Sequence, residues 1–137
     1  MLPHATATKP ALWCLFCLAL WVACTLPAAA FTLAEAGKAQ AVIVLPEKPT
    51  PAEKTAATEL ASYLGKITGA AFRPLSADQA AGRPRILVGP SAAARKILSD
   101  AVVDGLGSEE FVIRTVGRDL LLVGGRPRGT LYAVYSF

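Results

Sequence analysis

From residue 31 onward, the sequence contains no cysteine, no histidine and no tryptophan. The lack of cysteine and histidine excludes a disulfide, a cysteine or histidine nucleophile and a zinc site built from cysteine and histidine. The lack of tryptophan excludes a tryptophan platform on which a sugar could stack. The whole chain has 137 residues, which is too few for a (β/α)₈ barrel of about 200–250 residues or more. We therefore expect no catalytic residue, no cofactor and no metal in this chain.

A strong excess of one charge is also missing. From residue 31 there are 13 Lys+Arg and 10 Asp+Glu, which gives a net charge of +3. The basic residues are scattered and do not alternate with aromatic residues in a stripe. Nucleic-acid binding calls for a concentrated basic face, so we expect no nucleic-acid partner.

Residues 1–30 have the pattern of an export signal. A basic, acid-free start precedes 16 uncharged residues, 11–26, and a run of three alanines ends at Ala30. These features are typical of a secretory signal peptide. We expect cleavage between Ala30 and Phe31, export to the periplasm or the cell exterior, and membrane contact only through this segment. The alternatives are an uncleaved anchor, for which 16 residues is short against about 20, and lipoprotein processing at Cys24.

A helix with sharp ends is predicted over residues 51–68. Thr50 and Glu53 have the spacing of a capping box, and Pro51 suits the first helical position, where no N–H partner is needed. Gly69 suits a left-handed stop. Apolar residues at helical spacing predict one buried stripe, formed by Ala56, Leu60, Tyr63, Leu64 and Ile67.

The other segments predict a small mixed sheet packed with helices, an α/β (α+β) domain over residues 40–137. We expect the order β-α-β-β-α-β-β-α, with residues 31–39 as an N-terminal linker. The expected strands cover residues 40–45, 72–75 at a sheet edge, 85–88, 110–115 and 119–123. Residues 116–118 join the last two strands as a hairpin turn. One further helix is expected from a cap at Ser91 to Leu98 and another from Thr130, and residues 100–107 form a connection.

The helix from Thr130 has Leu131, Val134 and Tyr135 at helical spacing and reaches Phe137 without a cap, a glycine or a polar tail. A helix of this kind suggests that further sequence follows. We therefore expect the domain to be truncated at its C-terminal side.

Few side chains suggest chemistry. Glu109 and Glu110 are adjacent, but neighbours on a strand point to opposite faces. A glycosidase needs two carboxylates about 5–10 Å apart across one bond. We interpret the pair as the solvated start of a strand.

The run Gly124-Gly125-Arg126-Pro127-Arg128-Gly129 precedes the last helix. It fits either an anion cradle clamped by Arg126 and Arg128 or a tight strand-to-helix turn. Tyr132 and Tyr135 lie three apart on that helix, where they either stack on a sugar or pack against a neighbour. These two arginines and two tyrosines are our candidates for contacts at a domain junction or with a ligand.

Three segments together resemble a known family: the strand and capped helix from Val42 to Gly69, the strand and turn Ile86-Leu-Val-Gly-Pro-Ser91, and the stretch from Glu109 to Phe137 with its Arg-Gly-Thr-Leu helix. In this order they resemble the N-terminal domain of α-glucuronidases, which is similar to the second domain of β-N-acetylhexosaminidases. The resemblance covers about residues 40–137.

The resemblance implies a non-catalytic accessory domain of an exported glycoside hydrolase that acts in polysaccharide breakdown. It implies a partner as well, a (β/α)₈ catalytic domain that follows in the same parent chain and contains the family's catalytic carboxylates. The junction would lie near the last helix and the glycine-rich turn. Two alternatives stay open: a stand-alone exported module that binds a carbohydrate or envelope polymer, and a structural envelope protein held by an uncleaved signal.

Overall fold

A computed structural model describes residues 30–137. The predicted signal peptide of residues 1–30, with its cleavage, anchor and lipoprotein alternatives, lies outside the described residues except for Ala30. Within residues 30–137, no helix has the length and apolar character needed to span a membrane.

The first described helix, α2 (Pro51–Thr68), has the predicted bounds. The Glu53 backbone N–H donates to the Thr50 hydroxyl at 3.2 Å, and the Thr50 N–H donates to the Glu53 carboxylate at 2.8 Å. Each side chain thus satisfies a backbone donor that the first helical turn leaves free. At the other end, Gly69 has a φ of 70°, and its N–H donates to the Gly65 carbonyl. The predicted capping box and left-handed stop are confirmed.

Replacement of Thr50 by alanine is expected to lower the free energy of unfolding by about 1 kcal/mol, because the Glu53 N–H loses its acceptor. Urea unfolding followed by circular dichroism measures the change. Thr58→Ala in the same helix is the control, since Thr58 is exposed and donates only to the Lys54 carbonyl. Its expected change is at most about 0.5 kcal/mol. Equal losses for both variants would contradict a stabilising capping box.

The main sheet has five strands. In chain order they are β3 (Val42–Val44), β4 (Pro74–Leu75), β5 (Arg85–Val88), β6 (Phe111–Val116) and β7 (Asp119–Gly124). Their order in the sheet is β4-β3-β5-β7-β6. All neighbours run parallel except β6 and β7, which form an antiparallel hairpin. Pro74 cannot donate to a ladder, which explains why it lies in the edge strand β4.

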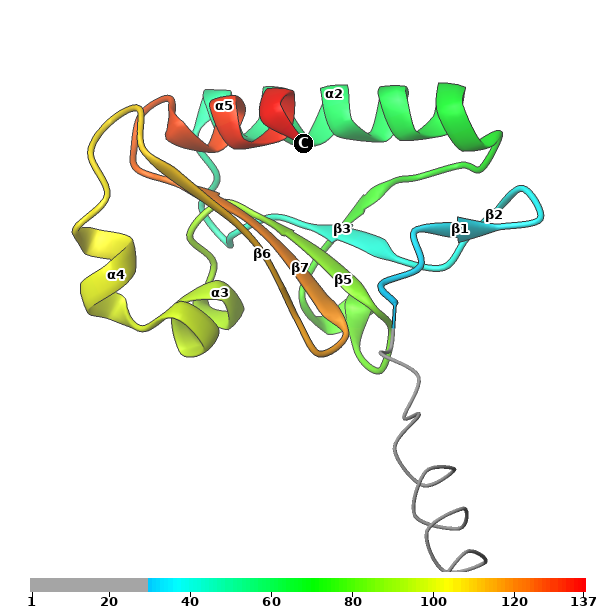
Figure 1. Cartoon of the computed structure of the whole chain (residues 1–137), viewed down its shortest axis with the longest axis horizontal. Coiled ribbons are helices and arrows are strands. Elements are labelled where there is room, and N and C mark those ends of the chain that lie inside the picture. Colours follow the sequence, from blue (N-terminus) through cyan, green and yellow to red (C-terminus); the bar gives the residue numbers. More distant parts are fainter. Residues whose placement is uncertain (1–29) are drawn as a thin grey trace, which may run out of the picture.

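Helices cover both faces of this sheet (Figure 1). α2 and α5 (Gly129–Ser136) lie side by side on one face, while α3 (Ala92–Leu98) and α4 (Asp100–Asp104) cover the other. Side chains of the central strands alternate between two buried clusters, one on each face. The predicted mixed sheet and element order are confirmed from β3 onward. The structure adds α4 in the connection expected at residues 100–107.

The segment 31–39, predicted as an N-terminal linker, forms a short antiparallel hairpin instead. Its strands are β1 (Ala34–Glu35) and β2 (Lys38–Ala39). Phe31 and Leu33 pack against the cluster under α2. Strands of two residues are too short for an alternating pattern to be visible in the sequence.

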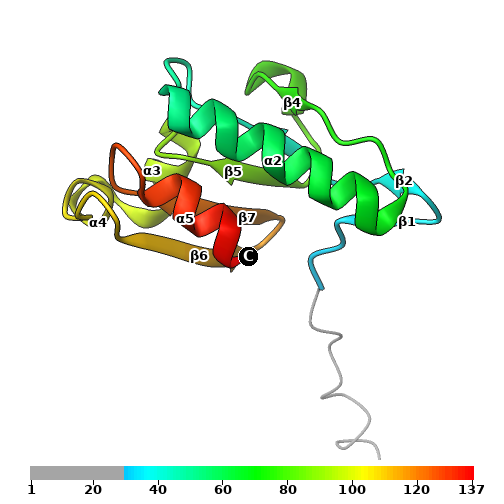
Figure 2. The same ribbon diagram turned by 90° about the horizontal axis from the view of Figure 1, so that it is seen from above.

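The predicted apolar stripe on α2 is only partly buried. Leu60 and Leu64 are buried, but Tyr63 is 53% exposed and Ile67 is 78% exposed. Figure 2 shows why: α5 is shorter than α2 and ends beside its middle, so none of the described helices lies next to the second half of α2. The predicted helical period was correct. The sequence pattern of α2 does not show how far α5 extends along it, so the pattern could not predict which part of the stripe is covered.

Candidate functional site

The turns that follow the parallel strands meet at one edge of the sheet. The turn after β3 leads to α2 on one face, and the turn after the neighbouring strand β5 leads to α3 on the other. This reversal of direction between adjacent strands is the usual place for a ligand in an open α/β sheet. The turn after β7, residues 124–129, reaches the same edge, so its charged residues are the first candidates for function.

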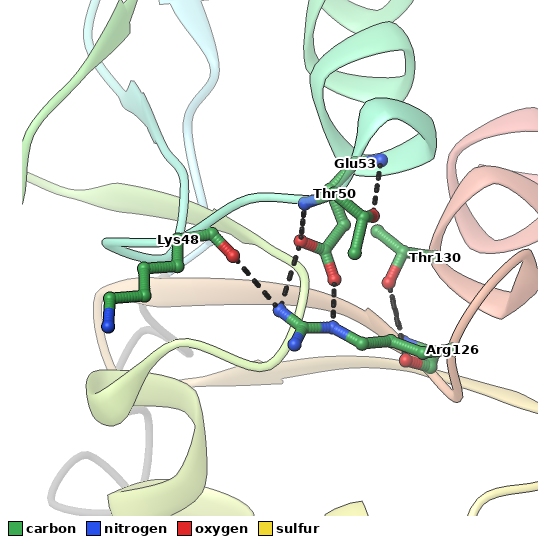
Figure 3. Close-up of polar contacts among 6 residues, drawn as sticks. Lys48, Thr50, Glu53, Arg126 and Thr130 are labelled. Atoms are coloured by element: carbon green, nitrogen blue, oxygen red, sulfur yellow. Dashed lines mark hydrogen bonds and ion pairs between the residues drawn. The ribbon is translucent and has the colours of Figure 1, made fainter.

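A buried ion pair joins the first helix to this last turn. The Glu53 carboxylate is only 1% exposed, and it accepts from Arg126 Nε at 2.9 Å and from Arg126 Nη2 at 3.3 Å (Figure 3). Arg126 Nη2 also donates to the Lys48 carbonyl at 3.3 Å. A buried carboxylate needs such partners to offset the loss of hydration. Arg126 therefore has a partner within the domain.

The glycines of the turn are required by close backbone packing. A Cβ on Gly124 would overlap the backbone of Gly129, and a Cβ on Gly125 would overlap the Gly107 carbonyl. The buried Thr130 hydroxyl accepts from the Gly124 N–H at 3.1 Å and faces the Gly124 carbonyl at 3.3 Å (Figure 3). These contacts support the interpretation as a tight strand-to-helix turn.

The backbone donors of the same turn are largely occupied. The N–H groups of Gly125, Arg128 and Gly129 donate to carbonyl groups of the domain, and that of Gly124 to the Thr130 hydroxyl. An anion cradle depends on free N–H groups pointing at the ligand. The arrangement therefore favours a structural turn over an anion site.

The remaining candidate charges are exposed and paired. Arg128 Nη2 donates to the Glu109 carboxylate at 2.8 Å, with both side chains 58% exposed. The Glu110 carboxylate accepts from the Gly107 N–H at 2.8 Å. Glu109 and Glu110 thus have different partners and do not form a catalytic pair.

The two candidate tyrosines lie on α5, and the structure does not gather all four candidates at one place. Arg126 and Arg128 precede the helix, whereas Tyr135 lies near its end and is 59% exposed. Tyr132 is half-buried. The roles proposed for these four residues at a junction or with a ligand stay predictions.

Tyr135 borders an apolar groove of about 380 Å³, which we call the α2–α5 groove. No charged residue of the described chain lines it. Its lining residues are Leu60, Tyr63, Leu64 and Ile67 of α2 with Val134, Tyr135 and Phe137 at the end of the chain. The lining suits an apolar partner surface and offers little that could fix a hydrophilic sugar.

A second hollow, of about 390 Å³, lies at the carboxyl ends of β3 and β4. Glu47 and Asp78 both line it, among mainly apolar residues. Among the residues that the structure describes, no group of three potential metal-ligating side chains is present. Sequence reasoning did not identify this hollow, because Glu47 follows β3 whereas Asp78 begins the short 3₁₀ helix Asp78–Ala80.

Three further ion pairs raise the pKa values of two arginines. The bidentate hydrogen bond to Asp119 raises the pKa of Arg85, and hydrogen bonds to Asp100 and Asp104 raise the pKa of Arg95. A pKa raised by folding stabilises the protein at all lower pH values and stops doing so only as the pH rises through it. Arg85 and Arg95 therefore stay charged at ordinary pH.

Residues 26–137 match a family model described as Glycosyl hydrolase family 67 N-terminus. No curated protein matches the chain.

Proposed function

The chain belongs to the glycosyl hydrolase family 67 N-terminal family, and from this premise we propose that it is the non-catalytic accessory domain of an exported, α-glucuronidase-like enzyme of polysaccharide breakdown. The observation that carries the proposal is the family match, which spans residues 26–137 and so includes every described strand and helix. Export would depend on the signal predicted for residues 1–30.

Three of the acidic side chains are engaged in ion pairs, which supports a non-catalytic role for these three. Glu53, Glu109 and Asp119 each form an ion pair with an arginine of the domain. Hydrolysis of a glycosidic bond needs one carboxylic acid as proton donor and a second carboxylate across the bond, both open to the sugar. Carboxylates held in ion pairs are poorly placed for either task.

The proposed partner is a (β/α)₈ catalytic domain that follows in the same polypeptide and supplies the reacting carboxylates. Such barrels carry their catalytic groups on their own strand ends. The present domain would therefore contribute to the stability and placement of the barrel, and the choice of substrate and linkage would belong to the barrel.

The 137-residue chain is expected to release no glucuronic acid from glucuronoxylan oligosaccharides, whereas the longer chain containing the barrel is expected to release it. Sequencing of the coding DNA beyond Phe137 should show an open frame for about 250 residues or more. Chromatography of the released sugars measures the activity. Turnover by the 137-residue chain would contradict a non-catalytic domain.

A stop codon directly after Phe137 would favour the alternative, a stand-alone exported binding module. The hollow lined by Glu47 and Asp78 is the observation that favours it, because it lies at the ligand-binding edge of the sheet. Titration of the chain with acidic and neutral oligosaccharides would then be the measurement to make.

A further inference from the structure

The second half of α2 presents apolar side chains that no other part of the described chain, residues 30–137, covers fully. Leu60 and Leu64 form the buried floor of the α2–α5 groove. Tyr63 and Ile67 stand beside them, more than half exposed. Exposed apolar residues are ordinary when they occur singly, but a contiguous set around a hollow marks an interaction surface.

The chemistry of the groove defines its occupant as apolar. Among the residues that the structure describes, no charged side chain lines it. Lys66 places its Nζ 4.9 Å from the ring centroid of Tyr63, one of the lining residues. The side-chain hydrogen-bonding groups of the lining are the hydroxyls of Tyr63 and Tyr135, so a strongly polar surface would lose more hydration there than two hydroxyls replace.

We propose that the catalytic domain that follows in the same polypeptide docks on the α2–α5 groove and covers the groove with apolar side chains. This inference rests on the proposed function. The observation that selects this occupant is the place of Phe137, which itself lines the groove and is 49% exposed. A polypeptide that continues from Phe137 starts at the groove. Such a short connection raises the effective concentration of the following domain at the groove to about the millimolar range.

The direction of α5 supports the same occupant. α5 runs beside α2 in the same direction and points along its uncovered half (Figure 2). Arg126 and Arg128, the other predicted junction residues, already bind acids of the domain. The inference therefore adds Leu60, Tyr63, Leu64 and Ile67 to the predicted contact of Tyr135.

Hydrogen exchange followed by mass spectrometry tests the contact. Peptides covering residues 60–68 are expected to exchange at least about tenfold more slowly in the longer chain than in the 137-residue chain, because the seated domain opposes local opening of α2. Peptides covering α3 and α4, on the opposite face of the sheet, should exchange equally in both chains. Equal exchange at residues 60–68 would overturn the proposal.

Ile67→Asp in the longer chain should remove this protection and lower the melting temperature of the N-terminal domain by roughly 10 °C or more. Val102→Asp is the matched control, since Val102 is also an exposed apolar residue (45%) but lies on α4. In the 137-residue chain both variants should shift the melting temperature by at most about 4 °C, which shows that they fold.

The other outcomes separate this inference from the proposed function. Glucuronic acid release by the longer chain together with equal effects of Ile67→Asp and Val102→Asp would overturn the inference alone. Self-association of the 137-residue chain that Ile67→Asp abolishes would assign the groove to a second copy and overturn it as well. A reading frame that closes after Phe137 would overturn both proposals.

Discussion

Gly125→Ala is expected to lower the free energy of unfolding by at least about 3 kcal/mol. The added Cβ would overlap the carbonyl oxygens of Leu106 and Gly107, which belong to the connection before β6. Backbone on both sides of the contact is fixed, because the Gly125 N–H donates to the Glu110 carbonyl at 3.0 Å. The overlap can be relieved only by separating the turn from that connection. Urea unfolding followed by circular dichroism measures the loss.

Gly65→Ala is the matched control, with the same atoms added and the opposite sign expected. Gly65 lies inside α2, and the nearest atom to its added Cβ is the Ala70 carbonyl oxygen at 3.4 Å, an ordinary contact. Alanine is the better helix former, so a gain of up to about 1 kcal/mol is expected. If the two variants had equal stabilities, the close approach at Gly125 would be refuted.

Arg126→Ala is expected to cost about 3 kcal/mol of unfolding free energy, near the lower end of the range for breaking a buried ion pair. The variant leaves the Glu53 carboxylate, 1% exposed, with the Thr50 N–H as its remaining donor. The lower end applies because the Arg126 side chain is itself 49% exposed and gives up less hydration in the native pair. Thermal and urea unfolding of the 137-residue chain measure the effect.

Arg128→Ala lies two residues further along the same turn and provides the comparison. Its ion pair with Glu109 is exposed on both sides, so a loss of at most about 1 kcal/mol is expected. A similar loss for both variants would mean that burial of Glu53 does not decide the strength of its pair with Arg126.

Much of the fold was predictable because its signals are local. The ends of α2 depend on Thr50, Glu53 and Gly69, which lie within or directly beside the helix. The hairpin of β6 and β7 depends on a two-residue turn in which Gly117 has a φ of 57°. Such features are complete within a few residues, so a reading of neighbours along the chain finds them.

The pairing of Glu53 with Arg126 was not predictable, because 73 residues separate them. The capping box already accounted for Glu53, and nothing in its neighbourhood signals a second partner. The exposure of Ile67 has the same origin: helical spacing assigns it to a face, while its burial depends on how far α5 extends. Both features are settled by packing between distant segments.

The place of β7 in the sheet has a consequence for synthesis of the protein. Among the strands that the structure describes, β7 comes last along the chain, yet it lies between β5 and β6. Its register joins Ile86 to Leu120 and Val88 to Leu122, so β5 has an open apolar edge until 34 further residues have been added. An open strand edge on a nascent chain invites pairing with other chains. In whichever compartment the chain folds, this edge of β5 is protected only once β7 has paired with it.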